Sequence, residues 1–214
     1  MGFALTTAHA NPLTLDASLA SANDELDTAT AREVVAWALA LAERPVLTTS
    51  FRPGAAALVH LVTRQCPDIP VVWVDTGYNT PATCRHVAAL SAAWRLNLHR
   101  YAPRMPASNH AVHAGGPPAV TDPGFLRFVR DIRLEPLERA FNVLKPDVWL
   151  GSPREGRGVV SRGTHHTLHV APLYRWSARD IAAYRALHGI PDYGDYFDPT
   201  RAGGGAAHGL QLSS

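Results

Sequence analysis

The feature that most constrains the fold is a strand–helix unit that repeats along the first half of the chain. Residues 46–51 form a short β-prone run, followed by the chain-breaking Arg52-Pro53-Gly54 and an apolar helix over 55–63. The next unit predicts a buried strand over 69–74 and a helix over 81–94, and a third strand follows over 96–101. Strands that alternate with helices indicate a mostly parallel sheet covered on both faces, so we expect an α/β protein with three α/β/α layers.

The rest of the sequence continues this pattern between two irregular ends. We expect an amphipathic helix between residues 27 and 45, a helix over 125–144, strands over 147–151 and 168–173, and a helix over 177–188 that Ser177 caps. Residues 102–124 and 152–167 are predicted as loops. The expected organisation is a loosely ordered N-terminal arm over 1–24, one α/β domain over 25–188 and a flexible C-terminal tail over 189–214.

Composition and charge exclude several classes of protein. A chain of 214 residues with 46% hydrophobic content can bury one sizeable core. The formal net charge of +2 argues against a nucleic-acid or anionic-membrane surface, and no apolar run is long enough to span a bilayer. The two cysteines, Cys66 and Cys84, lack zinc or CxxC spacing and are too few for an iron–sulfur cluster. We therefore expect a cytoplasmic protein with no metal and no cofactor.

Ligands of such sheets bind beyond the carboxyl ends of the strands, which directs attention to the loops there. The first loop offers hydroxyl side chains and N–H groups at a helix start, which can hold a phosphate; its candidates are Thr48, Thr49, Ser50, Phe51 and Gly54. An ordinary strand-to-helix turn would explain the same residues. The second loop offers Asp75, Thr76 and Gly77 for a ribose or a base edge, and Asp75 as a cap of the next helix is an equal alternative.

Basic side chains further along the chain supply the remaining candidates. Several arginines suit bidentate binding of phosphate or sulfate, namely Arg133, Arg154, Arg157 and Arg162. The alternatives are a solvated surface loop for residues 154–162 and an ion pair on the helix surface for Arg133. His165 and His166 are candidates for substrate contact or solvent exposure. A metal site with two histidine ligands is disfavoured because His166 and His169 would lie on opposite faces of a strand.

Distinctive sequence blocks stand in a fixed order over most of the chain: VLTTSF, PDIPVVWVDTGYNTP, LNLHRY, RDIRLEPLERAF, WLGSPRE, VAPLYRW and DYFDPTR. Together these blocks resemble the phosphoadenylyl-sulfate (PAPS) reductase family. The resemblance implies the adenine nucleotide α-hydrolase fold and a cytoplasmic enzyme that reduces a sulfonucleotide to sulfite. It further implies phosphate binding by the turn over 48–54, nucleoside binding by Asp75, Thr76 and Gly77, and anion binding by Arg133 and Arg154.

The C-terminus departs from the pattern of that family. A family tail ends in a Glu-Cys-Gly-Leu-His motif whose thiolate attacks the sulfur, and thioredoxin or glutaredoxin then releases sulfite. Here Ala207-His208-Gly209-Leu210-Gln211 stands at that place, and the imidazole of His208 cannot enter thiol–disulfide exchange. Cys84, near the start of a predicted helix, is a substitute thiol, with core packing as the alternative. The first cluster-binding cysteines of some family members are also replaced, here by Phe128 and Val129.

Our leading hypothesis is therefore a sulfonucleotide-binding enzyme that catalyses sulfuryl transfer or hydrolysis, with His208 as general base or nucleophile. One alternative is a PAPS reductase that uses Cys84 or a partner's thiol, with thioredoxin or glutaredoxin as reductant. Another is a sulfonucleotide-binding subunit without catalysis. The absent cluster residues favour PAPS over adenylyl sulfate (APS). A homodimer is one assembly that the resemblance suggests, and we expect no nucleic-acid or membrane partner.

Overall fold

A six-stranded sheet forms the centre of the molecule in the computed structural model, which describes residues 12–109, 115–153, 157–165 and 167–200. The strands lie in the order β3-β2-β1-β4-β6-β5, and all but β5 run parallel to their neighbours. Their bounds are β1 (Pro45–Thr49), β2 (Val71–Val74), β3 (Leu98–Tyr101), β4 (Val148–Leu150), β5 (Val160–Arg162) and β6 (Leu168–Val170). The predicted α/β class with a mostly parallel sheet is confirmed.

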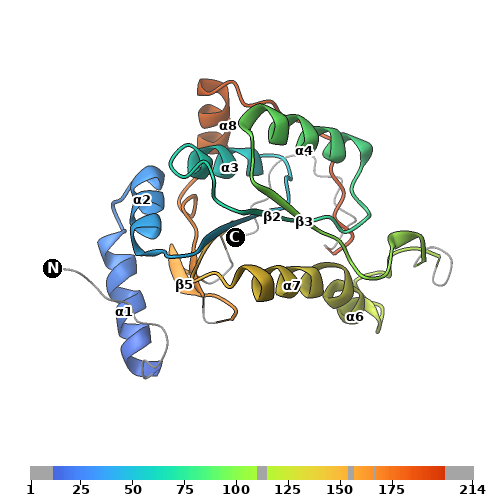
Figure 1. Ribbon diagram of the computed structural model, residues 1–214, viewed down its shortest axis with the longest axis horizontal. Coiled ribbons are helices and arrows are strands. Elements are labelled where there is room, and N and C mark those ends of the chain that lie inside the picture. The colour runs from blue at the N-terminus through green and yellow to red at the C-terminus, as the bar shows by residue number, and fades with distance from the viewer. Residues whose placement is uncertain (1–11, 110–114, 154–156, 166, 201–214) are drawn as a thin grey trace.

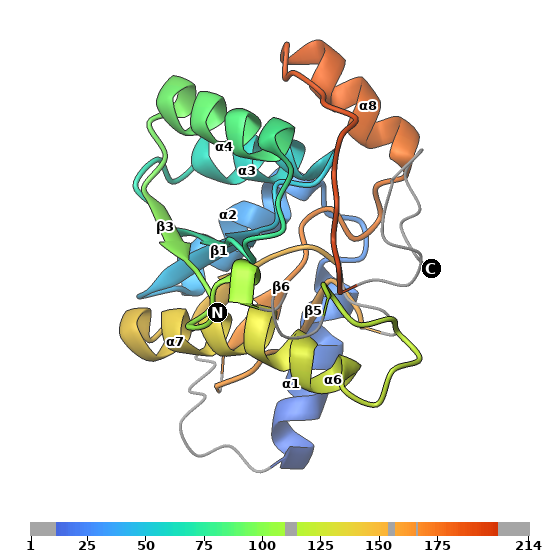
Figure 2. The same cartoon turned by 90° about the vertical axis from the view of Figure 1, so that its right-hand side faces the viewer.

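Helices cover both faces of the sheet, as Figures 1 and 2 show. On one face, α2 (Ala31–Leu41), α3 (Ala55–Thr63) and α4 (Pro81–Trp94) share the main core with Leu47, and α8 (Ala178–Leu187) lies against α3. On the other face, α7 (Glu135–Leu144) packs against Val46 and Trp149. Successive strand residues point to opposite faces, so Val46 and Leu47 contribute to separate cores. None of the helices in the described ranges is long and apolar enough to cross a membrane.

Side-chain caps fix where several of these helices begin. Ser177 accepts a hydrogen bond from the Asp180 N–H, and the Asp180 carboxylate accepts one from the Ser177 N–H, which is a reciprocal capping box at the start of α8. The predicted cap at Ser177 is thus confirmed. The Thr80 side chain likewise caps α4, by accepting from the Thr83 N–H, and Pro81 occupies its first turn, where a missing N–H is tolerated.

Residues 12–24, which we expected to be loosely ordered, are helical instead. They form most of α1 (Pro12–Glu25), and α1 is fastened to the edge strand β5 through Asn23. The Asn23 side chain donates to the Val160 carbonyl (2.8 Å) and accepts from the Val160 N–H (3.0 Å), as a neighbouring strand would. This pairing protects an otherwise exposed sheet edge. The segment over 152–167, predicted as loop throughout, contains β5, which is short and has no apolar alternation to mark it.

The long predicted helix over 125–144 is a continuous helix of three parts. An α-helical segment α6 (Phe125–Val129) leads into a π-helical segment η1 (Arg130–Leu134), and α7 follows. A π-helical turn contains an extra residue, so it changes the direction of the side chains on it, and such turns occur often at functional sites. Arg133, one of the predicted anion-binding residues, lies on this segment.

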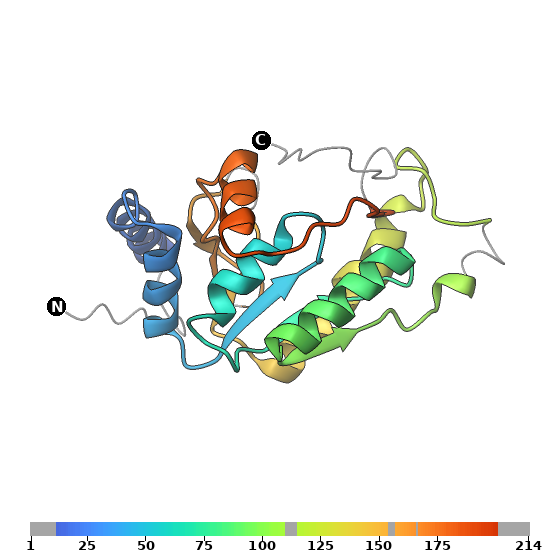
Figure 3. The ribbon, with the colours of Figure 1, turned by 90° about the horizontal axis from the view of Figure 1, so that it is seen from above.

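Residues 189–214 were predicted as a flexible tail, and the described part of this segment, 189–200, differs from that prediction, while 201–214 lie outside the described residues. Residues 190–200, which we call the C-terminal strap, are held against the domain by several contacts. Figure 3 shows this segment running from α8 across the N-terminal end of α4 toward α6. The Thr80 hydroxyl donates to the Asp195 carbonyl (2.8 Å), and Arg185 of α8 pairs with Asp192 (2.6 Å). The contact between Thr80 and Asp195 could not be predicted, because it joins residues far apart in the sequence.

Candidate functional site

One edge of the sheet collects the carboxyl ends of all its parallel strands, and we call it the carboxyl edge. After β1 the chain continues to β2 and β3 on one side, whereas β4 and β6 lie on the other side of β1. The space between β1 and β4 is thus a topological switch point, where open sheets of this kind bind their ligands. The candidate site is built from the segments that leave the sheet there, and from the strap that crosses it.

The turn between β1 and α3 has a backbone shape that suits an anion. Phe51 is fully buried and left-handed, with φ at 52°, and Gly54 has φ at 82°. The Phe51 N–H donates to Thr49 Oγ1 (3.0 Å), and its ring packs edge-on against Trp73. Gly54 offers no side chain to cap α3, so the positive end of the helix dipole stays available to a ligand. Ser50 lies between these groups. The five predicted phosphate-turn residues are therefore contiguous with the carboxyl edge.

Thr48 and Gly151 meet where β1 and β4 end. The Thr48 hydroxyl accepts a hydrogen bond from Trp149 Nε1 at 2.7 Å. A Cβ added to Gly151 would lie 3.1 Å from His169 Nε2, 3.1 Å from Trp149 Nε1 and 3.3 Å from Thr48 Oγ1. Glycine therefore lets the chain leave β4 this close to β1 without displacing those side chains. Thr48 takes part in an internal hydrogen bond within the sheet, while Thr49 is the last residue of β1 and Ser50 follows it into the turn.

Asp75 is buried at the end of β2, and its carboxylate organises the loop that follows. It accepts hydrogen bonds from the Gly77 N–H (3.2 Å) and from Asn79 Nδ2 (2.6 Å), and it forms an ion pair with Arg100 of β3. The alternative role as a helix cap is wrong, because Thr80 is the cap of α4. Thr76 accepts from the Tyr78 N–H (3.3 Å), so the whole loop is held in one conformation.

Tyr78 completes that loop with a hydroxyl that has no hydrogen-bond partner among the described residues. Its ring contacts Phe128 of α6, with the ring centres 5.8 Å apart. Burial raises the pKa of Tyr78, so the hydroxyl stays protonated and able to donate at neutral pH. A buried donor without a partner at the carboxyl edge is an available contact for a ligand.

Arg133 reaches from the π-helical segment to the C-terminal strap. Its Nη1 lies 3.2 Å from Asp198 Oδ2 and donates to the Thr200 hydroxyl at 2.9 Å. Asp198 is buried and also accepts from the Thr200 N–H (3.0 Å). The alternative was an ion pair on the helix surface with a nearby acidic residue. Arg133 does form an ion pair, but the carboxylate is that of Asp198, which lies far along the chain. Arg133 keeps 40% of its side chain exposed, so it can also face an anion.

The remaining basic candidates do not lie together. Arg157 is exposed and lies just before β5. The first residue of β5, Val160, pairs with Val170 at the carboxyl end of β6, so Arg157 lies at the carboxyl edge. Arg162 pairs with Leu168 at the start of β6, which places it at the opposite edge because β5 is antiparallel. His165 lies in the loop between these strands, beyond the same opposite edge. The prediction that Arg162 and His165 join the site is wrong for this reason. Arg154, His166 and His208 lie outside the described residues.

The two cysteines occupy different ends of the domain. Cys84 lies in the first turn of α4, at the carboxyl edge, and it is exposed, so the alternative of core packing is wrong. Cys66 lies just after α3, near the opposite edge, and is half buried against the main core. Within the described ranges, no group of three or more metal-ligating side chains is gathered in one place.

Sequence reasoning missed three residues of this edge, namely Arg100, Tyr193 and Asp198. Arg100 pairs with Asp75, Tyr193 donates to the Phe51 carbonyl, and Asp198 holds Arg133. The block DYFDPTR, which contains Asp198, stood out in the sequence, but nothing in it indicated which side chains it would meet. Only the folded chain brings the strap to the turn and to the π-helical segment.

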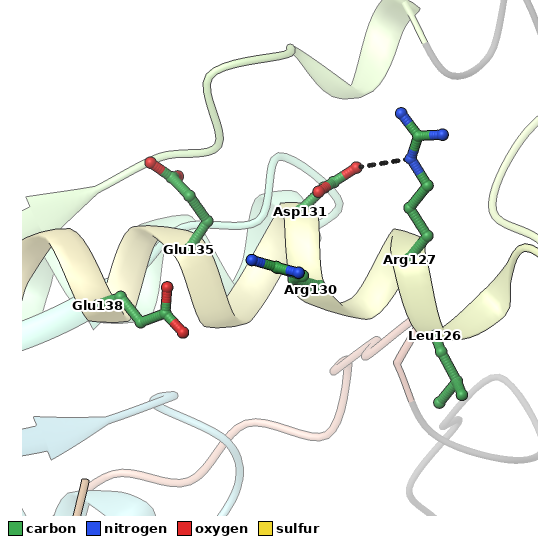
Figure 4. A pocket seen from close by; sticks show the side chains of 6 residues that line it. All are labelled: Leu126, Arg127, Arg130, Asp131, Glu135 and Glu138. Carbon is green, nitrogen blue, oxygen red and sulfur yellow. Dashed lines mark ion pairs between the residues drawn. The ribbon is translucent and has the colours of Figure 1, made fainter. Parts of the chain in front are cut away.

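A separate hollow of about 570 Å³ lies along the outer side of the helix over 126–138 (Figure 4). Its lining consists of Leu126, Arg127, Arg130, Asp131, Glu135 and Glu138. Arg127 pairs with Asp131 (3.8 Å), and Arg139 and Arg104 both bind Glu135, which lowers the pKa of that carboxyl. The lining carries two arginines and three carboxylates, so it offers no site of a single positive sign for an anion, and this hollow is not part of the candidate site.

Comparisons with known sequences indicate one family. Residues 44–198 match the family model of the phosphoadenosine phosphosulfate reductase domain. The phosphoadenosine 5′-phosphosulfate reductase of Alkalilimnicola ehrlichii is 35% identical over 191 residues, which cover 86% of this chain and 78% of that protein. The enzyme of the same name from Thiocapsa roseopersicina is 33% identical over 185 residues, covering 83% and 77% of the two chains.

Solved structures show the same fold. The crystal structure of PAPS reductase from Candida auris, in complex with phosphate, superposes with a TM-score of 0.72 at 19% identity and covers 86% of this chain and 90% of its own. The U34-tRNA thiolase NcsA of Methanococcus maripaludis, with its [4Fe-4S] cluster, is more distant, with a TM-score of 0.55 at 10% identity, covering 76% and 64%. The region that the family model matches includes the turn after β1, the Asp75 loop, Arg133 and the strap as far as Asp198. This chain belongs to the phosphoadenosine phosphosulfate reductase family.

Proposed function

We propose that this protein binds a sulfonucleotide, PAPS in preference to APS, at the carboxyl edge of its sheet, in sulfur metabolism. The observation that carries the proposal is that two groups with the chemistry to bind an anion lie at that edge, the left-handed turn before α3 and Arg133 on the π-helical segment. The helix dipole and a guanidinium both favour phosphate and sulfate groups. The phosphate bound in the Candida auris enzyme supports anion binding in this fold.

The nucleotide would lie across the switch point. Its phosphates would approach the turn over 48–54, with Arg133 and Arg157 as guanidinium partners. Its adenosine would approach the Asp75 loop, where the Tyr78 hydroxyl is a buried donor without a partner among the described residues. Because Asp198 also binds Arg133, the ligand has to share that arginine with a carboxylate. Arg154, which precedes Arg157 on the same segment of the sequence, stays a candidate for the same role.

For the reaction we favour transfer of the sulfuryl group to water or another oxygen acceptor. A water molecule attacks the sulfur, the bond from sulfur to the bridging oxygen breaks, and the products are sulfate and adenosine 3′,5′-bisphosphate. His208 would accept the proton of the attacking water, because imidazole titrates near neutral pH. In the sequence, His208 follows Gly203-Gly204-Gly205, and its approach to the nucleotide is part of the proposal.

Calorimetric titration of the purified chain with PAPS, APS and adenosine 3′,5′-bisphosphate, followed by analysis of products, tests the proposal. We expect binding of the 3′-phosphorylated ligands to be the tighter, sulfate as product, and loss of turnover in His208→Ala with binding retained. Unchanged turnover in His208→Ala would remove that residue from the mechanism. Tight binding without product would identify a binding subunit, and indifference to all three nucleotides would refute the proposal.

A second candidate function is thiol-dependent reduction, which the exposure of Cys84 at the carboxyl edge favours. Its thiolate would attack the sulfur, forming S-sulfocysteine and releasing adenosine 3′,5′-bisphosphate. A thioredoxin or glutaredoxin dithiol would then release sulfite and become a disulfide. Sulfite that appears with PAPS and reduced thioredoxin, and disappears in Cys84→Ser, would establish this route. Sulfite that persists in Cys84→Ser would assign the attacking thiol to a partner.

A further inference from the structure

The C-terminal strap contacts the turn after β1 through the side chain of Tyr193. Its hydroxyl donates a hydrogen bond to the carbonyl oxygen of Phe51. The ring lies on His86 of α4, with ring centres 4.3 Å apart, which fixes its position. Burial raises the pKa of Tyr193, so the hydroxyl keeps its proton at neutral pH and remains a donor.

Phe51 is the residue of the turn that most needs external support. A left-handed backbone at a residue other than glycine is strained and persists only where neighbouring groups hold it in place. Thr49 Oγ1 accepts from the N–H of Phe51, and Tyr193 donates to its carbonyl. The peptides on both sides of Phe51 are therefore fixed by side chains, one from the strand and one from the strap.

Fixing the Phe51 carbonyl also fixes the N–H that follows it. The peptides of the described chain are trans, and in a planar trans peptide the C=O and the next N–H point in opposite directions. The orientation of the Arg52 N–H is thus set by the bond from Tyr193. N–H groups of such a turn, at the start of a helix, are the groups that bind phosphate oxygens.

We infer that Tyr193 is a positioning residue for anion binding, which holds the turn over 48–54 in the conformation that receives a phosphate group. The inference rests on the proposed function, and it adds that the C-terminal strap helps to set the affinity. Tyr193 acts through Phe51, so its effect falls on the phosphates of the ligand and not on the adenosine.

The test compares Tyr193→Phe with Asp192→Asn in the full-length protein. Asp192 also anchors the strap, because its Oδ2 accepts from Arg185 Nη1 of α8 at 2.6 Å, and this contact does not reach the turn. Its Oδ1 accepts from the Tyr193 N–H at 2.9 Å, a bond that the amide oxygen of asparagine can keep. Each protein is titrated with adenosine 3′,5′-bisphosphate and with adenosine. Tyr193→Phe should weaken binding of the bisphosphate roughly fivefold, as expected for one neutral hydrogen bond, and leave adenosine unchanged. Asp192→Asn should leave both affinities unchanged.

Amide hydrogen exchange of residues 49–57 without ligand provides a second measurement. Exchange should be faster in Tyr193→Phe and unchanged in Asp192→Asn. If the wild type binds the bisphosphate and Tyr193→Phe binds it equally well, or if both variants lose affinity equally, the inference is overturned while the proposed function stands. If the wild type binds neither ligand, the proposed function fails, and amide hydrogen exchange alone then tests the role of Tyr193. Faster exchange in Tyr193→Phe but not in Asp192→Asn supports that role. Equal exchange in the two variants overturns it.

Discussion

Replacing Gly158 with alanine should destabilise the protein by a mechanism that the structure makes specific. Gly158 lies one residue after Arg157 and two before Val160, where α1 meets the edge strand. An added Cβ would lie 2.3 Å from Asn23 Oδ1 and 2.8 Å from Asn23 Cγ, which is closer than real Cβ atoms approach other groups. Gly158 is not among the glycines with positive φ, so the cost is steric and not conformational.

The magnitude follows from the hydrogen bonds that the clash disrupts. To make room for the Cβ, the Asn23 amide must move away from both the N–H and the carbonyl of Val160, at 3.0 Å and 2.8 Å. Val160 is 2% exposed, so its backbone groups lose their partners away from water. At about 1–2 kcal/mol for each such group, Gly158→Ala should lower the free energy of unfolding by about 2–4 kcal/mol.

Urea unfolding of a double-mutant cycle separates this clash from other effects. Asn23→Ala alone should cost about the same 2–4 kcal/mol, because it removes the same hydrogen bonds. In that background Gly158→Ala should cost close to zero, since the atoms it clashes with are gone. Gly124→Ala is the matched control, because no atom lies within 4 Å of its added Cβ and its φ is −82°. If Gly158→Ala costs as much in the Asn23→Ala background as in the wild-type chain, the steric reasoning is wrong.

We make three further predictions, on the effect of pH, on the proposed anion-binding role of Arg133 and on a helix cap. The pKa of His60 is lowered, first by burial of the ring and then by the neighbouring His188. Below about pH 6.5 the unfolded chain therefore binds more protons than the folded protein, and stability falls as the pH drops. Urea titrations at about pH 7.5 and about pH 5.5 should show a smaller loss in His60→Gln, and an equal loss would contradict this assignment. Arg133→Gln should weaken calorimetric binding of adenosine 3′,5′-bisphosphate about tenfold or more, whereas Arg130→Gln, on the outer hollow, should have no effect. Ser177→Ala should lower stability by about 1 kcal/mol through loss of the cap of α8, and an unchanged melting temperature would refute it.

The fold was predictable wherever a local pattern sufficed. The helices at 55–63 and 81–94 were predicted with the bounds that the structure has, because each follows a β-prone run and a turn signal. The short strand β5 and the helix α1 were missed, because β5 lacks alternation and α1 has no clear apolar face. The contact between Asn23 and Val160 joins these two elements, and its partners lie far apart in the chain.

The candidate site shows the same division. Loops that follow parallel strands must meet at one edge, so Ser50 and Asp75 could be assigned to the carboxyl edge from strand order alone. Arg162 and His165 were misplaced because β5 runs antiparallel to β6, and no residue of that segment indicates this direction. Asp75 proved to organise its own loop through Gly77 and to pair with Arg100, and that pair depends on the neighbouring strand.

The sequence by itself determined the alternation of strands and helices and the family. These follow from local patterns and from residue identity. Only the tertiary structure decided that the C-terminal strap crosses the candidate site, that Tyr193 donates to the Phe51 carbonyl and that Asp198 pairs with Arg133. The physical reason is that a hydrogen bond between distant residues depends on the path of the whole chain, which no short stretch of sequence contains.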